Sequence, residues 1–86
     1  MQVVFSKSFK KQYKKLPIQI QDQTKSRILL WQQNPQDSQL NLHRLKGKFS
    51  RYWSINITGD IRAFYEITDE QTYVFAKIGS HSQLYG

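Results

Sequence analysis

The last nine residues, 78–86, hold the side chains best suited to chemistry, because a histidine and a tyrosine follow an apolar stretch at the end of a basic chain. Gly79 can adopt the positive φ of a sharp turn, and the serines beside His81 keep that turn polar. We therefore expect His81 at a surface rim, where an imidazole can give or take a proton near neutral pH. The alternative is that His81 is an ordinary loop histidine and that Tyr85 is an apolar anchor for the terminus.

Positive charge is the second feature that points to a ligand. Thirteen Lys and Arg residues against six Asp and Glu give the 86-residue chain a net charge of +7, and such a field attracts polyanions, with nucleic acid the leading candidate. Lysines crowd residues 7–15, where they can simply form the solvated face of a helix. A second basic run, interleaved with Phe49 and Tyr52, is a candidate nucleic-acid-binding surface and comprises Arg44, Lys46, Lys48 and Arg51.

The sequence predicts that the first half of the chain is mainly helical. Val3 to Phe5 is a short strand, and Ser6 or Ser8 can then cap a helix. Pro17 separates this helix from a second one, which ends near Gln33 before an Asn-Pro pair.

The second half has a hydrophobic period of two from residue 52 onward, which indicates β-strands. Turn signals at residues 58–60 and 68–70 divide it into three strands. We therefore predict an α+β fold, with a short N-terminal strand, a two-helix hairpin and an antiparallel β-meander that forms one sheet with the helices on one face. A single domain spanning residues 1–86 accommodates all of these elements.

The alternation also divides the predicted strands between two faces. The expected core face consists of Trp53, Ile55, Ile57, Ala63, Tyr65, Val74, Ala76 and Ile78. The opposite face combines Arg62 and Lys77, which can hold phosphate, with Phe64 and Phe75, which can stack on bases. A turn after Lys77 brings His81 close to them. The alternative is a solvated sheet face with scattered hydrophobic residues.

Several classes of protein are excluded by what the sequence lacks. Cysteine is absent, so the chain has neither a disulfide framework nor a thiolate metal site, and it suits a reducing cytoplasm. The segment 1–5 is too short for the apolar region of a signal peptide, and no apolar run approaches the length of a membrane span. We therefore expect a cytoplasmic protein with no membrane partner.

The order of the elements, the hairpin from Trp53 to Glu66 and the C-terminal motif of residues 78–86 resemble the RelE/ParE superfamily of bacterial toxin-antitoxin toxins, and within it the YafQ-type messenger-RNA interferases. The resemblance spans nearly the whole chain. It implies a ribosome-dependent endoribonuclease, a hydrolase that cleaves messenger RNA in the decoding site and thereby inhibits translation. It also implies silencing by a cognate antitoxin, with operator DNA as a further partner through the antitoxin complex.

The resemblance carries over residue by residue. The catalytic histidine of the terminal motif falls on His81, and Tyr85 stands where YafQ-type sequences have phenylalanine. Arg62 matches the hairpin arginine, and Lys77 matches the basic residue before the motif. His43 matches an upstream histidine, and Asp60 matches the acid after the turn glycine. Asn56 stands where YafQ-type members have a further histidine. Any acid/base pair must therefore come from His81, His43, Asp60 and Tyr85.

The chemistry of such a site can be assembled from the residues themselves. RNA supplies the nucleophile, its 2′-OH, so the protein removes that proton, neutralises the phosphorane and protonates the leaving 5′ oxygen. We assign His81 to proton transfer as the general acid, and Arg62 and Lys77 to the phosphate. Tyr85 would stack on a base or orient His81, whereas Asp60 has the alternative role of a turn residue.

No metal or cofactor is expected, because two histidines without a cluster of carboxylates or thiolates make a poor ligand set. Two other functions remain open. A ParE-like inhibitor of DNA gyrase would share the fold without the nuclease residues, and a non-enzymatic module would use the basic and aromatic residues only to bind RNA or the ribosome.

Overall fold

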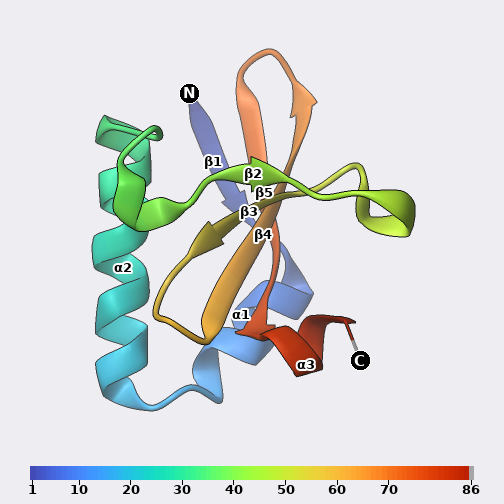
Figure 1. Cartoon of the computed structure of the whole chain (residues 1–86). Coiled ribbons are helices and arrows are strands. Elements are labelled where there is room, and N and C mark those ends of the chain that lie inside the picture. The colour runs from blue at the N-terminus through green and yellow to red at the C-terminus, as the bar shows by residue number, and fades with distance from the viewer. Residues whose placement is uncertain (86) are drawn as a thin grey trace.

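The computed structural model describes residues 1–85 and confirms the α+β fold (Figure 1). Its five strands form a mixed sheet in the order β1-β5-β4-β3-β2. The strands are β1 (Gln2–Phe5), β2 (His43–Arg44), β3 (Trp53–Asn56), β4 (Ile61–Asp69) and β5 (Thr72–Ser80). The helices are α1 (Lys7–Lys14), α2 (Ile18–Gln33) and α3 (His81–Tyr85), with short 3-10 turns η1 (Ser38–Leu40) and η2 (Gly47–Phe49). Gly86, the end of the C-terminal motif, lies outside the described residues.

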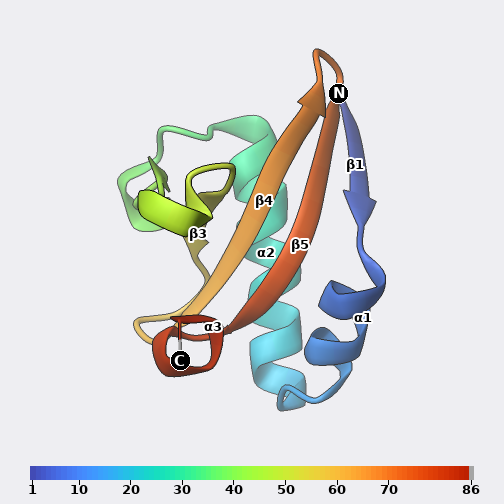
Figure 2. The same cartoon turned by 90° about the vertical axis from the view of Figure 1, so that its right-hand side faces the viewer.

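The N-terminal helices begin and end where the sequence predicts. The Ser6 hydroxyl caps α1 by accepting a hydrogen bond from the Phe9 N–H at 3.0 Å. Pro17 directly precedes α2, and α2 ends at Gln33 before the Asn-Pro pair. In Figure 2, α2 lies behind β4 and β5, while α3 lies in front of their lower ends. The helix hairpin therefore covers one face of the sheet.

The strands confirm the antiparallel meander of β3, β4 and β5, to which β1 adds in parallel beside β5. The sequence did not predict β2, which pairs His43 with Ser54 and Arg44 with Trp53. Two residues are too few to show a hydrophobic period. Within residues 1–85 no helix has the length and apolar character needed to cross a membrane.

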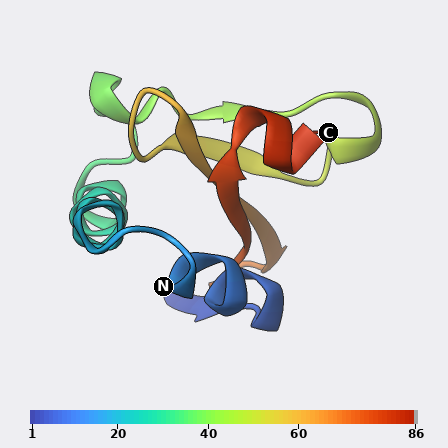
Figure 3. The same ribbon diagram turned by 90° about the horizontal axis from the view of Figure 1, so that it is seen from below.

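Both faces of the sheet are covered by apolar packing. The main core lies between the sheet and the α1–α2 hairpin and includes Phe9, Trp31, Ile55, Tyr65 and Ile78. A second, smaller core on the opposite face consists of Leu45, Tyr52, Phe64 and Leu84, with Phe49, Ala76 and Tyr85 packed against it. In the view from below, α1 and α3 lie on opposite sides of the end of β5 (Figure 3). The face predicted to be open is therefore partly closed by α3 and η2.

A β-bulge overturns the predicted facing of the last strand. Phe64 pairs with Lys77, but Tyr65 pairs with Phe75, so Ala76 is an extra residue that reverses the alternation on its N-terminal side. Phe75 is consequently buried in the main core against Trp31, with ring centroids 5.1 Å apart. The predictions that Phe75 is exposed and that Val74 and Ala76 belong to the main core are wrong.

Phe64 lies on the predicted face, but the prediction that it is exposed is also wrong. Its side chain is 0 % exposed because the second core covers it, with the Tyr52 and Tyr85 rings 6.0 and 5.5 Å away. Neither Phe64 nor Phe75 offers a free ring to a nucleobase.

Candidate functional site

The C-terminal end of β5 gathers four of the predicted site residues. Arg62 on β4 is paired with Gly79 on β5, and Lys77 lies two residues before that glycine. The His81 and Tyr85 rings, one helical turn apart on α3, are 4.5 Å apart between centroids. Proton-transfer, cationic and aromatic groups are therefore placed together on the face opposite the helix hairpin.

A reciprocal pair of hydrogen bonds holds α3 in place. The Ser80 hydroxyl accepts from the Gln83 N–H at 3.2 Å, and the Gln83 side-chain oxygen accepts from the Ser80 N–H at 2.8 Å. This is a capping box, and Leu84 anchors the helix in the second core. Gly79 lies in β5 with no positive φ, so the sharp turn predicted there is wrong. A Cβ at this position would lie 2.9 Å from the Gln83 side-chain oxygen, so a larger residue would displace the side chain that caps α3.

We expect Gln83→Ala to loosen α3, because it removes the side-chain acceptor at a cost of about 0.5–2 kcal/mol in local stability. Amide hydrogen exchange across residues 81–85 measures this. Alanine has the higher helix propensity, so lost protection must come from the lost hydrogen bond. Gln83→Glu keeps the acceptor and should retain protection; equal protection in all three proteins contradicts the role of the box.

Tyr85 is both an anchor and a neighbour of His81. Its ring packs edge-on against Phe49 and Phe64, with centroids 5.0 and 5.5 Å away. Burial raises the pKa of the Tyr85 phenol, while the positive charge of Arg62 acts in the opposite direction. The phenol therefore keeps its proton near neutral pH, and the ring limits the positions that the His81 imidazole can take.

The Arg62 guanidinium retains capacity to bind a ligand. It donates one long hydrogen bond, 3.4 Å, to the Gly59 carbonyl in the turn before β4. A guanidinium has several N–H donors in a planar fork, so this bond leaves others for phosphate oxygens. Asp60 lies exposed in the same turn, where its N–H donates to the Thr58 hydroxyl at 3.2 Å. The structure thus gives the Asp60 backbone a role in the turn.

His43 lies on the same face of the sheet as this cluster, at the far edge. His43, Ser54, Phe64 and Lys77 form one cross-strand row, so roughly 14 Å separates the two ends at the usual strand spacing. The His43 Nδ1 lies 2.8 Å from the Asn41 carbonyl. A carbonyl only accepts, so Nδ1 carries the hydrogen and the neutral ring has its lone pair on Nε2.

Lys48 of the second basic run and Lys77 of β5 lie near Phe49, which sequence reasoning did not assign to the site. Lys48 and Lys77 place their Nζ atoms 5.3 and 5.8 Å from the centre of the half-buried Phe49 ring. Arg51 lies over Tyr52 at 5.1 Å, and Lys46 is exposed. The interleaving of aromatic and basic residues was the signal that could have identified Phe49 as the surface aromatic group.

Arg44 departs from the rest of the basic run. It is paired with Trp53 and lies 6.0 Å from that ring, and its Nε donates to the Ser50 carbonyl at 2.8 Å. Since residues on adjacent positions of a strand face opposite sides, Arg44 and His43 start from opposite faces of the sheet. Arg44 therefore starts from the face of the sheet opposite the cluster around His81.

Two buried polar atoms beneath the site have no hydrogen-bond partner. They are the Ser54 hydroxyl oxygen and the Asn56 carboxamide oxygen, whose residues pair across the sheet with Phe64 and Arg62. A buried polar group costs about 1–3 kcal/mol when it is unpaired. Within the described part of the chain, His, Cys, Asp and Glu form no group of three or more that could hold a metal ion.

Comparison with known proteins gives one family match. The family model described as "Bacterial toxin of type II toxin-antitoxin system, YafQ" matches residues 1–86. No curated protein matches the chain at a significant level.

Among solved structures, YafQ from E. coli strain BL21(DE3) is similar at a TM-score of 0.83 and 20% identity, covering 98% of this chain and 97% of that one. YafQ in the E. coli DinJ-YafQ toxin-antitoxin complex gives 0.81 and 20%, covering 98% and 96%. The RelB-RelE antitoxin-toxin complex from Methanococcus jannaschii gives 0.73 and 24%, covering 95% and 94%. These structural likenesses show the fold.

Proposed function

Because the chain belongs to the YafQ family of bacterial type II toxin-antitoxin toxins, we propose that it is a ribosome-dependent endoribonuclease that cleaves messenger RNA without a metal ion. The observation that carries the proposal is the cluster at the end of β5. There the His81 imidazole contacts Tyr85, and the cations of Arg62 and Lys77 share the same face. This combination of an imidazole, a phenol and two cations suits phosphodiester cleavage.

The reaction begins with the 2′-OH of the RNA, which attacks the adjacent phosphorus while the bond to the 5′ oxygen breaks. His81 donates a proton to that leaving oxygen as the general acid. Arg62 and Lys77 neutralise the charge that develops on the phosphorane. Tyr85 orients His81, and the Phe49 ring beside it is the surface against which a base can stack.

His43 and Asp60 are the remaining candidates for the general base, and the tautomer of His43 suits that role although its strand position lies roughly 14 Å from that of Lys77. The His43 Nδ1 hydrogen is committed to the Asn41 carbonyl, which leaves Nε2 free to accept the proton of the 2′-OH. His43 is exposed on the same face of the sheet as Lys77. Asp60, whose turn already explains its position, is the alternative base.

The partners follow from the same assignment. A cognate antitoxin is a partner of this toxin, as the complexes of its YafQ and RelE relatives indicate. Messenger RNA on the ribosome would be the substrate, with the basic residues around Phe49 in contact with RNA phosphates. Cleavage there would inhibit translation in the cytoplasm, and the antitoxin complex would be the form that contacts operator DNA.

We expect the purified toxin to cut messenger RNA on programmed ribosomes and to leave the same RNA intact in free solution. Attack by the 2′-OH should yield a 5′-hydroxyl on the downstream fragment and a cyclic phosphate on the upstream one. Primer extension locates the cut, and end-group analysis identifies the products.

Two outcomes would support other functions. Intact RNA on the ribosome with measurable ribosome binding would indicate a non-enzymatic binding module. Intact RNA together with loss of supercoiling by DNA gyrase would indicate a ParE-like inhibitor.

A further inference from the structure

The segment between α2 and β2 contains an unusual backbone conformation. Asn41 has a φ of 46° and lies in the left-handed region, and within residues 1–85 it is the one residue other than glycine with a positive φ. Left-handed backbone is costly for every residue with a Cβ, although asparagine tolerates it better than most. Such conformations persist where the surrounding structure holds them, and they are concentrated at functional sites.

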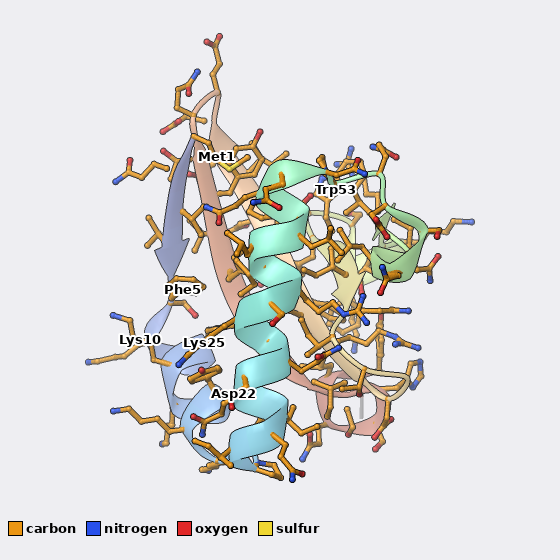
Figure 4. All side chains as sticks on the ribbon, turned by 90° about the vertical axis from the view of Figure 1, so that its left-hand side faces the viewer. Met1, Phe5, Lys10, Asp22, Lys25 and Trp53 are labelled. Atoms are coloured by element: carbon orange, nitrogen blue, oxygen red, sulfur yellow. The ribbon has the colours of Figure 1, made fainter. Side chains whose placement is uncertain are left out.

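The structure holds Asn41 between two leucines that are anchored in the main core. Leu40 is fully buried at the end of η1, and the half-buried Leu42 packs against the same core. Figure 4 shows Trp53, which lines a small hollow together with Leu42, beside the chain that leaves the upper end of α2. The Asn41 N–H donates to the Ser38 carbonyl at 3.3 Å and closes η1. The chain therefore turns within one exposed residue whose two neighbours are fixed.

This turn places the Asn41 carbonyl against the side chain two residues later. Its oxygen lies 2.8 Å from the His43 Nδ1, and a carbonyl can only accept a hydrogen bond. The neutral imidazole therefore carries its hydrogen on Nδ1 and has its lone pair on Nε2. When Nε2 takes a proton, Nδ1 still donates to the same carbonyl, and a hydrogen bond from the charged ring is the stronger one.

We propose that Asn41 is a positioning residue for the general base, because its left-handed backbone fixes the His43 tautomer whose Nε2 can accept the proton of the 2′-OH. The inference rests on the proposed function, in which His43 is a candidate for that base. The acceptor is a backbone carbonyl, so the side chain at position 41 acts only through the conformation that it permits. Residues that permit the left-handed conformation should therefore replace Asn41, and residues that exclude it should not.

The test uses the full-length toxin with substitutions that differ in the φ they allow. Asn41→Gly leaves the left-handed conformation accessible, Asn41→Val disfavours it, and Asn41→Pro excludes it because the proline ring holds φ at about −65°. Nitrogen-15 NMR of the His43 imidazole distinguishes the two tautomers in the free toxin. Single-turnover cleavage on saturating programmed ribosomes measures the rate, and thermal unfolding shows which variants are folded. The double variant with His43→Ala separates an effect through His43 from a general loss of stability.

We expect the tautomer with hydrogen on Nδ1 to predominate in the unaltered toxin and in Asn41→Gly, and glycine to retain most of the cleavage rate. Folded Asn41→Val and Asn41→Pro proteins should mix the two tautomers. They should cut roughly 5- to 30-fold more slowly, which is the factor by which left-handed backbone is disfavoured for a residue with a Cβ. In His43→Ala toxin, Asn41→Val should cause no further loss of rate.

Three results would overturn the proposal. They are an unchanged His43 tautomer in both Asn41→Val and Asn41→Pro, a changed tautomer without slower cleavage, and an equal loss of rate from Asn41→Val with and without His43. If the unaltered toxin fails to cut RNA, the nuclease function fails, and the NMR comparison still decides whether Asn41 sets the His43 tautomer.

Discussion

A folded His81→Ala variant should cut messenger RNA on programmed ribosomes roughly 10²- to 10⁴-fold more slowly than the unaltered toxin, because it lacks the positioned proton donor. Expression of the unaltered toxin without antitoxin should arrest growth, and the variant should relieve that arrest. The His81 side chain is exposed, so its removal should change the unfolding temperature little. Single-turnover cleavage at saturating ribosome concentration measures the rate of the chemical step.

His81→Gln and Ser82→Ala are the matched controls for this result. Glutamine retains hydrogen bonding but transfers no proton, so it should be as slow as alanine. Ser82 follows His81 in α3 and is also exposed, and its replacement should leave the rate nearly unchanged. Cleavage at the full rate by folded His81→Ala protein would remove His81 from the mechanism.

The protonation state of Tyr85 simplifies the interpretation of how the cleavage rate depends on pH. Burial raises the pKa of its phenol, so Tyr85 stays protonated through the range in which an imidazole titrates. Tyr85 should therefore contribute no limb to the pH profile of the cleavage rate near neutral pH. The profile of His81→Ala should lose the limb that reports the general acid.

The fold could be predicted where each element carries its own local signal. Ser6 caps α1, an Asn-Pro pair ends α2, and the turn before β4 separates strands with a regular period of two. The facing of β5 could not be predicted, because the bulge at Ala76 is fixed by packing of Phe75 on Trp31 and leaves no mark in the hydrophobic pattern. The inserted residue, Ala76, was therefore assigned to the wrong face together with Val74 and Phe75.

The sequence predicted which charged and titratable residues gather at the end of β5, but it did not identify the residues that support them. His81, Tyr85, Arg62 and Lys77 come together because α3 turns back over the sheet, and the Ser80-x-x-Gln83 spacing that caps this helix was readable in the sequence. The exposed aromatic residue was misassigned because α3 itself covers Phe64. A short helix held by tertiary packing thus decides which ring remains at the surface.

Arg62→Lys should lower the cleavage rate on saturating ribosomes by roughly 10²-fold while changing ribosome affinity little, because lysine keeps the charge but loses the planar fork. Arg62 is paired across the sheet with Gly79, which precedes His81 by two residues, and the positive charge of Arg62 acts on the Tyr85 phenol. A guanidinium there can hold two phosphorane oxygens while His81 protonates the leaving group. Cleavage rate and ribosome binding must be measured on the same preparations.

Lys48→Ala provides the contrasting case, because Lys48 belongs to the basic run and its Nζ lies 5.3 Å from the centre of the Phe49 ring. Removing this exposed cation should weaken ribosome association and flatten its dependence on salt, with less effect on the rate once bound. Replacing a residue that acts in the transition state therefore lowers the cleavage rate constant. Replacing a residue that acts in docking instead raises the dissociation constant for the ribosome. If Arg62→Lys and Lys48→Ala both alter affinity alone, Arg62 is a docking residue, and the charge on the phosphorane must be neutralised by Lys77 instead.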